Sequence, residues 1–189
     1  MNSLIVLLPF LSFVICITFG RFLGSRGVSI ITVLVMCVSF FFSLFNLYYV
    51  ISFSSVNIVK YFTWVDNSIL NITWTFQFDS LSSIMLVVVT FISLLVHFYS
   101  IGYMYYDPHL IRFMSYLSLF TFFMLMLVTS GNFFQLFLGW EGVGLASYLL
   151  INFWYTRLQA NKSAIKAIII NNFGDFALVL AMLITYDVF

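Results

Sequence analysis

The chain has 189 residues, of which 63% are hydrophobic and only 7% are charged, and its formal net charge is +1. A soluble domain carries about 25% charged residues, so this composition excludes an ordinary soluble fold and indicates a membrane protein. The near-neutral charge excludes a strongly basic nucleic-acid-binding surface, and membrane lipids are the expected surroundings.

Six apolar stretches are each long enough to cross a bilayer, for which a helix needs about 20 largely apolar residues. They cover residues 4–20, 29–53, 80–105, 112–130, 133–155 and 163–186. The sequence therefore predicts an all-α membrane protein, with one membrane domain over residues 1–189 and six transmembrane helices.

The connection between the second and third stretches has a different pattern. In "LNITWTFQFD", apolar and polar residues alternate, which is typical of a strand with one apolar face. The preceding "VKYFTWV" is rich in aromatic and β-branched residues, and "DNS" between the two segments is typical of a turn. We therefore predict a small β-hairpin over about residues 58–78, followed by Asp79 as the N-cap of the next helix.

Basic residues gather in the connections on one side of the predicted bundle. Six of the seven Lys and Arg residues fall there, and only Lys60 falls on the other side. The positive-inside rule places the six-cation side in the cytoplasm or matrix, and both chain ends on the opposite side. The six residues are Arg21, Arg26, Arg112, Arg157, Lys162 and Lys166.

Two acids, Glu141 and Asp175, lie deep inside the fifth and sixth stretches. Glu141 follows Phe133 by eight residues, which places it about 12 Å along a helix and near the middle of a ~30 Å hydrocarbon core. An ionised carboxylate at that depth costs roughly 2.5–3.5 kcal/mol. Each acid therefore has to be protonated, paired or hydrated.

Polar residues accompany both acids toward the cation-rich side. Tyr148 and Asn152 share a helical face with the first acid, and Asn171 and Asn172 precede the second by about one turn. The arrangement indicates a wetted half-channel that leads to two proton-carrying carboxylates. The alternative is a set of structural acids and amides that hydrogen-bond neighbouring helices.

Other candidates for chemistry are weaker. His97 lies in the inner half of the third stretch, where it is either part of a proton path or a hydrogen-bonded core histidine. The sequence shows no Cys/His spacing typical of a metal site and no glycine loop that follows a strand, as phosphate binding requires. We therefore expect no cofactor and no metal in this chain.

Four stretches are similar to one family of membrane proteins. "FDSLSS", "LVHFYSIGYM", "GWEGVG" and "NNFGDF" resemble the N-terminal part of the NADH dehydrogenase subunit 5 family, the distal antiporter-like subunits of mitochondrial respiratory complex I. The resemblance runs from about residue 78 to about residue 180. It implies a multi-pass protein of the mitochondrial inner membrane, with both ends on the intermembrane-space side. It also implies a proton-translocating subunit of NADH:ubiquinone oxidoreductase that performs no redox chemistry itself.

The resemblance assigns roles to the two deep acids. Glu141 matches a glutamate that pairs with a lysine on a broken helix further along the chain, and Asp175 matches the aspartate of the sixth helix. The family usually has an arginine three residues before that aspartate, where this chain has Asn172. Lys166 is no substitute, because nine residues separate it from Asp175 by about 13 Å along the axis.

The chain is far shorter than a complete subunit 5. Our hypothesis is that it is the N-terminal fragment of a split subunit, which supplies Glu141 to a Glu–Lys proton site completed by another chain. The expected partners are the other membrane-arm subunits of complex I, including a separate chain that carries the remainder of subunit 5. The alternatives are a structural fragment that does not pump and a subunit of a sodium/proton antiporter.

Overall fold

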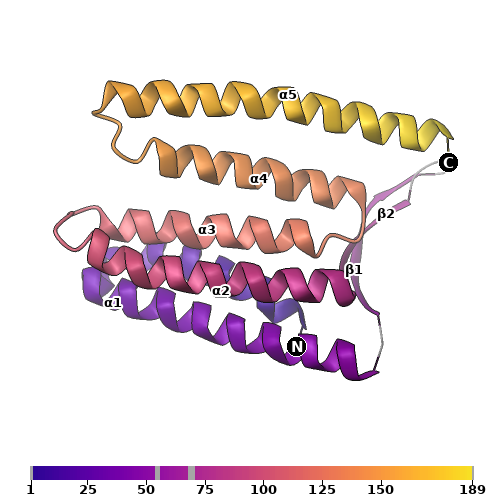
Figure 1. Cartoon of the computed structure of the whole chain (residues 1–189), viewed down its shortest axis with the longest axis horizontal. Coiled ribbons are helices and arrows are strands. Elements are labelled where there is room, and N and C mark those ends of the chain that lie inside the picture. Colours follow the sequence, from indigo (N-terminus) through magenta and orange to yellow (C-terminus); the bar gives the residue numbers. More distant parts are fainter. Residues whose placement is uncertain (1, 54–55, 68–70, 189) are drawn as a thin grey trace.

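The computed structural model describes residues 2–53, 56–67 and 71–188. In this part of the chain, five helices lie side by side and a two-stranded sheet covers one end of them (Figure 1). All five are long and apolar enough to cross a membrane. The elements are α1 (Asn2–Phe53), β1 (Asn57–Asp66), β2 (Asn71–Phe78), α2 (Ser80–Tyr103), α3 (Leu110–Val128), α4 (Phe133–Ile151) and α5 (Leu158–Val188).

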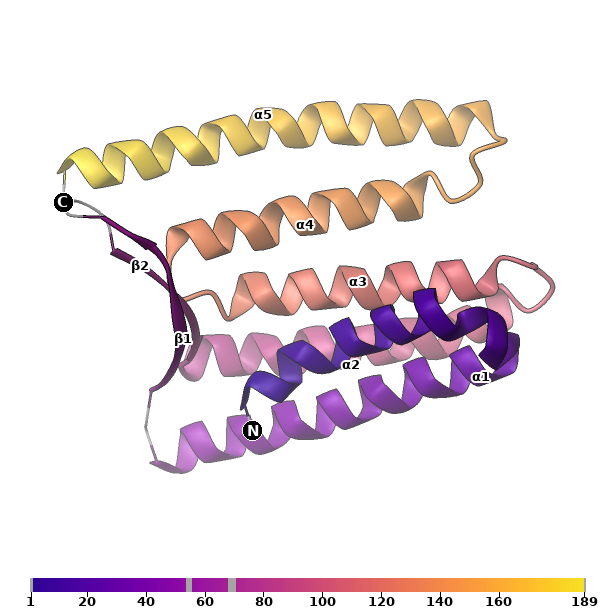
Figure 2. The same ribbon diagram turned by 180° about the vertical axis from the view of Figure 1, so that it is seen from behind.

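Helix α1 bends back on itself. Gly24 has a φ of 68° and a ψ of 177°, a conformation that is costly for residues with a Cβ, and Figure 2 shows the two arms of α1 on either side of the bend. The Ser39 hydroxyl of the second arm donates to the Ile5 carbonyl of the first over 3.1 Å. The two arms hold the stretches predicted at 4–20 and 29–53. They form one helical element, so the prediction of six separate helices is not confirmed.

The remaining helices match the apolar stretches, with shifted ends. Helix α4 ends at Ile151, four residues earlier than predicted, because the chain turns at Asn152, whose N–H donates to the Tyr148 carbonyl over 2.9 Å. Helix α5 begins at Leu158, five residues earlier than predicted. Its first turns are polar, and a search for apolar residues therefore does not find them.

The predicted hairpin is confirmed. Strands β1 and β2 pair in antiparallel fashion, from Asn57 opposite Phe78 to Asp66 opposite Asn71. Ile72, Phe76 and Phe78 are buried, as the alternating pattern indicates. The predicted turn lies partly outside the described residues, because residues 68–70 are not described.

The C-terminal half of strand β2 is fixed to neighbouring helices. Asp79 forms a capping box with Ser82 at the start of α2, which confirms its predicted role as N-cap. On the side away from β1, the Gln77 N–H donates to the Thr129 carbonyl over 2.8 Å. The backbone N–H of Thr75 donates to the side chain of Gln135 in α4 over 3.1 Å. An isolated hairpin is marginal in water, and these contacts explain how this one is held.

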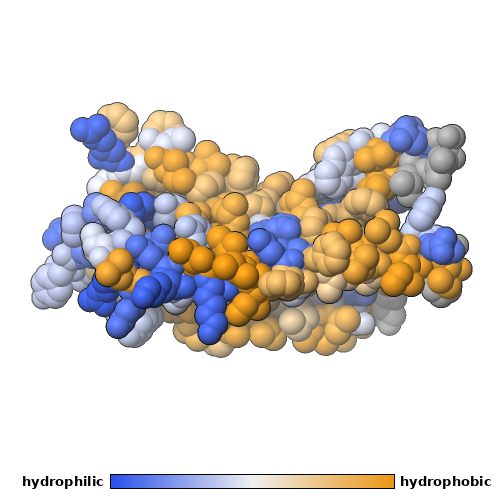
Figure 3. Space-filling view, turned by 90° about the horizontal axis from the view of Figure 1, so that it is seen from above, coloured by the Kyte–Doolittle hydropathy of each residue, from blue (hydrophilic) through white to orange (hydrophobic). Residues whose placement is uncertain are grey.

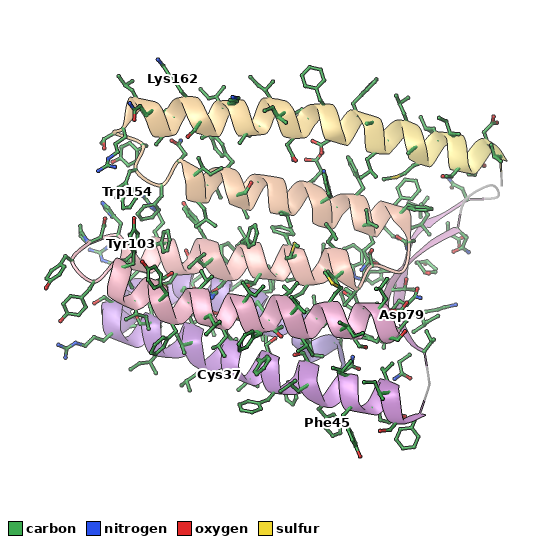
Figure 4. The ribbon with its side chains drawn as sticks, in the orientation of Figure 1. Cys37, Phe45, Asp79, Tyr103, Trp154 and Lys162 are labelled. Atoms are coloured by element: carbon green, nitrogen blue, oxygen red, sulfur yellow. The ribbon has the colours of Figure 1, made fainter. Side chains whose placement is uncertain are left out.

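The surface is organised as a membrane span requires. Figure 3 shows hydrophilic residues gathered at one end of the molecule and a mainly apolar surface over the rest, with a hydrophilic patch that interrupts it near the middle. Trp154 and Lys162 lie at one end of the bundle and Asp79 at the other (Figure 4). Helix α5 forms the edge of the bundle and packs mainly on α4 (Figure 1).

Candidate proton site

Glycines let α4 approach its neighbours closely. A Cβ at Gly139 would stand 2.8 Å from the Cα of Leu127 in α3, and Gly142 also faces α3. Toward α5, a Cβ at Gly144 would collide with the amide nitrogen of Asn171. Small residues of this kind allow helix backbones to pack tightly in membranes. The middle of α4 is therefore held between α3 and α5.

Asp175 of α5 is buried in this contact and receives a hydrogen bond from α4. The indole Nε1–H of Trp140 donates to its Oδ1 over 2.7 Å. The carboxyl group is 7% exposed, and its other oxygen, Oδ2, has no hydrogen-bond partner among the described residues. A buried carboxylate oxygen without a hydrogen-bond partner costs desolvation free energy. Oδ2 can therefore accept a hydrogen bond from a further donor, or it can carry a proton.

Glu141 follows Trp140 directly, and its carboxyl group interacts with that of Asp175. Two carboxylates at such range repel each other when both are ionised, and an apolar setting strengthens the repulsion. The two acids are therefore coupled, and their protonation has to be treated as a property of the pair.

A groove of about 650 Å³ lies along this side of α4 and α5. Glu141, Tyr148, Asn171 and Asn172 line it, together with apolar residues. Glu141 is exposed and lines the groove, whereas Asp175 is buried and does not line it. Among the described residues that line the groove there is no Lys, Arg or His.

Two family models match this chain. The model of NADH-ubiquinone oxidoreductase (complex I), chain 5 N-terminus, matches residues 64–114, and that of the NADH:quinone oxidoreductase/Mrp antiporter transmembrane region matches residues 130–188. NADH-ubiquinone oxidoreductase chain 5 of Acanthamoeba castellanii is 57% identical over 189 residues, and those of Arabidopsis thaliana and Marchantia polymorpha are 55% and 54% identical.

Over its whole length the chain is similar to part of NADH-ubiquinone oxidoreductase chain 5. All of its residues align with these relatives, including those before residue 78, where the sequence motifs gave no resemblance. It spans 28% of the length of the curated relatives that it matches.

A solved structure supports the fold of this chain. A chain of the membrane-bound sulfane sulfur reductase, an archaeal respiratory membrane complex, superposes with a TM-score of 0.80 at 16% identity. The match covers 92% of this chain and 34% of the other. At this identity the likeness shows the fold alone.

Two of the proton-path residues predicted from the sequence lie away from the groove. Asn152 is the C-cap of α4 and does not line the groove. His97 lies on α2 and is 1% exposed; its Nδ1 lies 2.8 Å from the Ser93 carbonyl oxygen and its Nε2 lies 3.3 Å from the Ser118 hydroxyl. Both ring nitrogens are engaged, which favours the interpretation of His97 as a core histidine.

Trp140 is the functional candidate that sequence reasoning missed. It stands beside Glu141 in "GWEGVG", and its role in the site depends on Asp175, which lies 35 residues later in the chain. The sequence feature that could have pointed to Trp140 is Asn172, which stands in place of the arginine that the resemblance leads one to expect. A buried carboxylate without that arginine needs another hydrogen-bond donor.

Proposed function

We propose that this segment supplies Glu141 and Asp175 to a proton-translocating site in the membrane arm of respiratory complex I. The observation that supports the proposal most strongly is the pair of acids at the contact of α4 and α5, where Glu141 lines a groove with Tyr148 and two asparagines in the middle of an apolar bundle. Placing an acid inside the membrane costs free energy, and acids in such surroundings typically mark proton paths.

Each residue of the pair has a distinct role in the proposal. Trp140 holds the Asp175 carboxyl group through its indole N–H, and Glu141 presents its own carboxyl group to the groove. A lysine that enters the groove favours the ionised form of Glu141, because opposite charges attract. Glu141 then releases its proton along the groove, past Tyr148 and the asparagines.

The lysine belongs to parts of chain 5 outside this segment. Our hypothesis places it in a separate chain that carries the remainder of subunit 5, and this stays a prediction, as do the other membrane-arm subunits as partners. The same proposal has α1 cross the membrane twice, which gives six crossings within one domain. It places both ends on the intermembrane-space side of the mitochondrial inner membrane, and redox cofactors in other chains.

One observation favours the alternative of a structural segment that does not pump. Asn172 stands where the family usually has an arginine, so the charge of Asp175 lacks that partner. The exposure of Glu141 toward the groove favours the pump, because a purely structural acid would be packed against its hydrogen-bond donor.

A structure of the natural respiratory assembly that contains this chain tests the proposal. We expect a lysine amine in the groove within about 4 Å of the Glu141 carboxylate, or joined to it by one water. A groove filled by lipid or by apolar side chains alone would contradict it.

A further inference from the structure

A second groove lies at the bend of α1, at the cation-rich end of the bundle. It has a volume of about 490 Å³ and lies between three helices. Its polar lining comes from Ser25, Arg26 and Ser29 of α1 and from Tyr105, which follows α2, while Ile101 and Leu110 contribute apolar walls. None of these residues belongs to the candidate proton site.

The charge at this end of the bundle is strongly positive. Six of the seven cations lie there, and of the six Asp and Glu residues only Asp107 does. Asp107 is already engaged, because the His109 N–H donates to it over 2.8 Å and the Trp154 indole over 3.2 Å. Arg26 is exposed and lines the groove, so its guanidinium is available to an external anion.

The groove presents hydroxyl groups beside this guanidinium. The Ser29 hydroxyl already donates to the Ser25 carbonyl over 2.8 Å, so its hydrogen is not available to a ligand. The hydroxyls of Ser25 and Tyr105 line the same space. A guanidinium with neighbouring O–H donors is a combination that recognises phosphate oxygens.

An apolar stripe continues from the groove along the second arm of α1. Ile30 also lines the groove and is 59% exposed, and Leu34 and Val38, at 58% and 42%, follow it at intervals of four residues. Residues four apart share one helical face, so the stripe runs from the groove toward the middle of the apolar band. An acyl chain can pack against this apolar stripe, whereas a free phosphate gains no favourable contact from it.

We propose that this groove binds the phosphate of an anionic phospholipid, with Arg26 as its charged partner and one acyl chain along Ile30, Leu34 and Val38. The lipid joins the bend of α1 to the connection between α2 and α3 from the outside.

The test compares Arg26→Gln with Arg21→Gln in the natural protein, purified in detergent with phosphatidylglycerol. Both variants remove one exposed charge near the same bend, but Arg21 does not line the groove. Retained phosphatidylglycerol is counted by native mass spectrometry, with and without excess inorganic phosphate, and thermal unfolding checks that each variant is folded.

We expect Arg26→Gln to lose one retained phosphatidylglycerol per copy, Arg21→Gln to keep it, and inorganic phosphate not to displace it. Equal retention in both variants, equal loss in both, or equal retention of phosphatidylcholine by the unmodified protein would overturn the proposal. Displacement by inorganic phosphate would replace the lipid with a free-phosphate site. If Arg26→Gln does not fold, Tyr105→Phe serves instead, and a retention unchanged from the unmodified protein would then overturn it.

Discussion

The indole N–H of Trp140 donates a 2.7 Å hydrogen bond to the buried carboxylate of Asp175 and so joins α4 to α5. The family usually places an arginine near that aspartate, and this chain has Asn172 instead. A neutral indole donor supplies a hydrogen bond but no positive charge. If Asp175 is ionised, any charge compensation therefore has to come from a cation outside this pair of residues.

Replacing Trp140 with phenylalanine removes this donor and keeps most of the ring. A hydrogen bond to a charged group contributes roughly 1.5–3 kcal/mol, so its loss should leave the Asp175 carboxyl group poorly held against α4, and proton pumping should fall about tenfold or more. The measurement is proton uptake by the reconstituted respiratory complex. Trp154→Phe is the matched control, since it removes an indole bond to half-buried Asp107, which does not line the groove, and should leave pumping unchanged.

The two acids should behave as one unit. Because Asp175 is hydrogen-bonded to Trp140, the residue next to Glu141, the proposal places both acids in one site, and Glu141→Gln, Asp175→Asn and the double variant should reduce pumping to nearly the same level. A double-mutant cycle on the pumping rate measures this coupling. Losses that multiply, as for two independent sites, would show that the acids serve separate paths.

Gly139 should be indispensable for packing. A Cβ at this position meets the backbone of Leu127, which cannot rotate away, so Gly139→Ala should destabilise the bundle by about 1–3 kcal/mol. Gly102→Ala is the control, because nothing lies within 4 Å of a Cβ there. Thermal unfolding in detergent compares the two variants, and equal stability would contradict the observed closeness of α3 and α4.

Asp107 should make stability depend on pH at the cation-rich end. The backbone N–H of His109 and then the Trp154 indole hold the pKa of its carboxyl below the ordinary value. A depressed pKa in the folded state adds stability above the unfolded value of about 3.9, and this contribution is lost as pH falls through the folded pKa. Unfolding temperatures below about pH 5 should therefore fall less for Asp107→Asn than for the unmodified chain, and parallel curves would contradict the assignment.

The sequence predicted the parts of this fold that depend on local pattern. Apolar length located the helices, period-two alternation located the hairpin, and Asp79 was recognisable as a cap. The sequence did not predict that the two arms of α1 form one helical element. The bend that joins them depends on the backbone angles of a single residue, Gly24. The early start of α5 was missed because its first residues are polar.

The sequence predicted only part of the candidate site. Glu141 and Asp175 stood out because carboxylates are rare in apolar stretches, and the helical period placed Tyr148 beside one of them. The contact between Trp140 and Asp175 depends on how α4 and α5 rotate against each other, which no periodicity within one helix gives. For the same reason the sequence left both interpretations of His97 open, and its bonds to Ser93 and Ser118 favour the structural one.

The most direct test of the central claim is the proton-to-electron ratio of the natural respiratory complex with Glu141→Gln. Asp66→Asn on the exposed hairpin is the control, because it removes an acid far from the groove. We predict that Glu141→Gln assembles and oxidises NADH but translocates fewer protons per electron, while the control keeps the full ratio. An unchanged ratio in a fully assembled Glu141→Gln complex would show that this segment only supports the membrane arm.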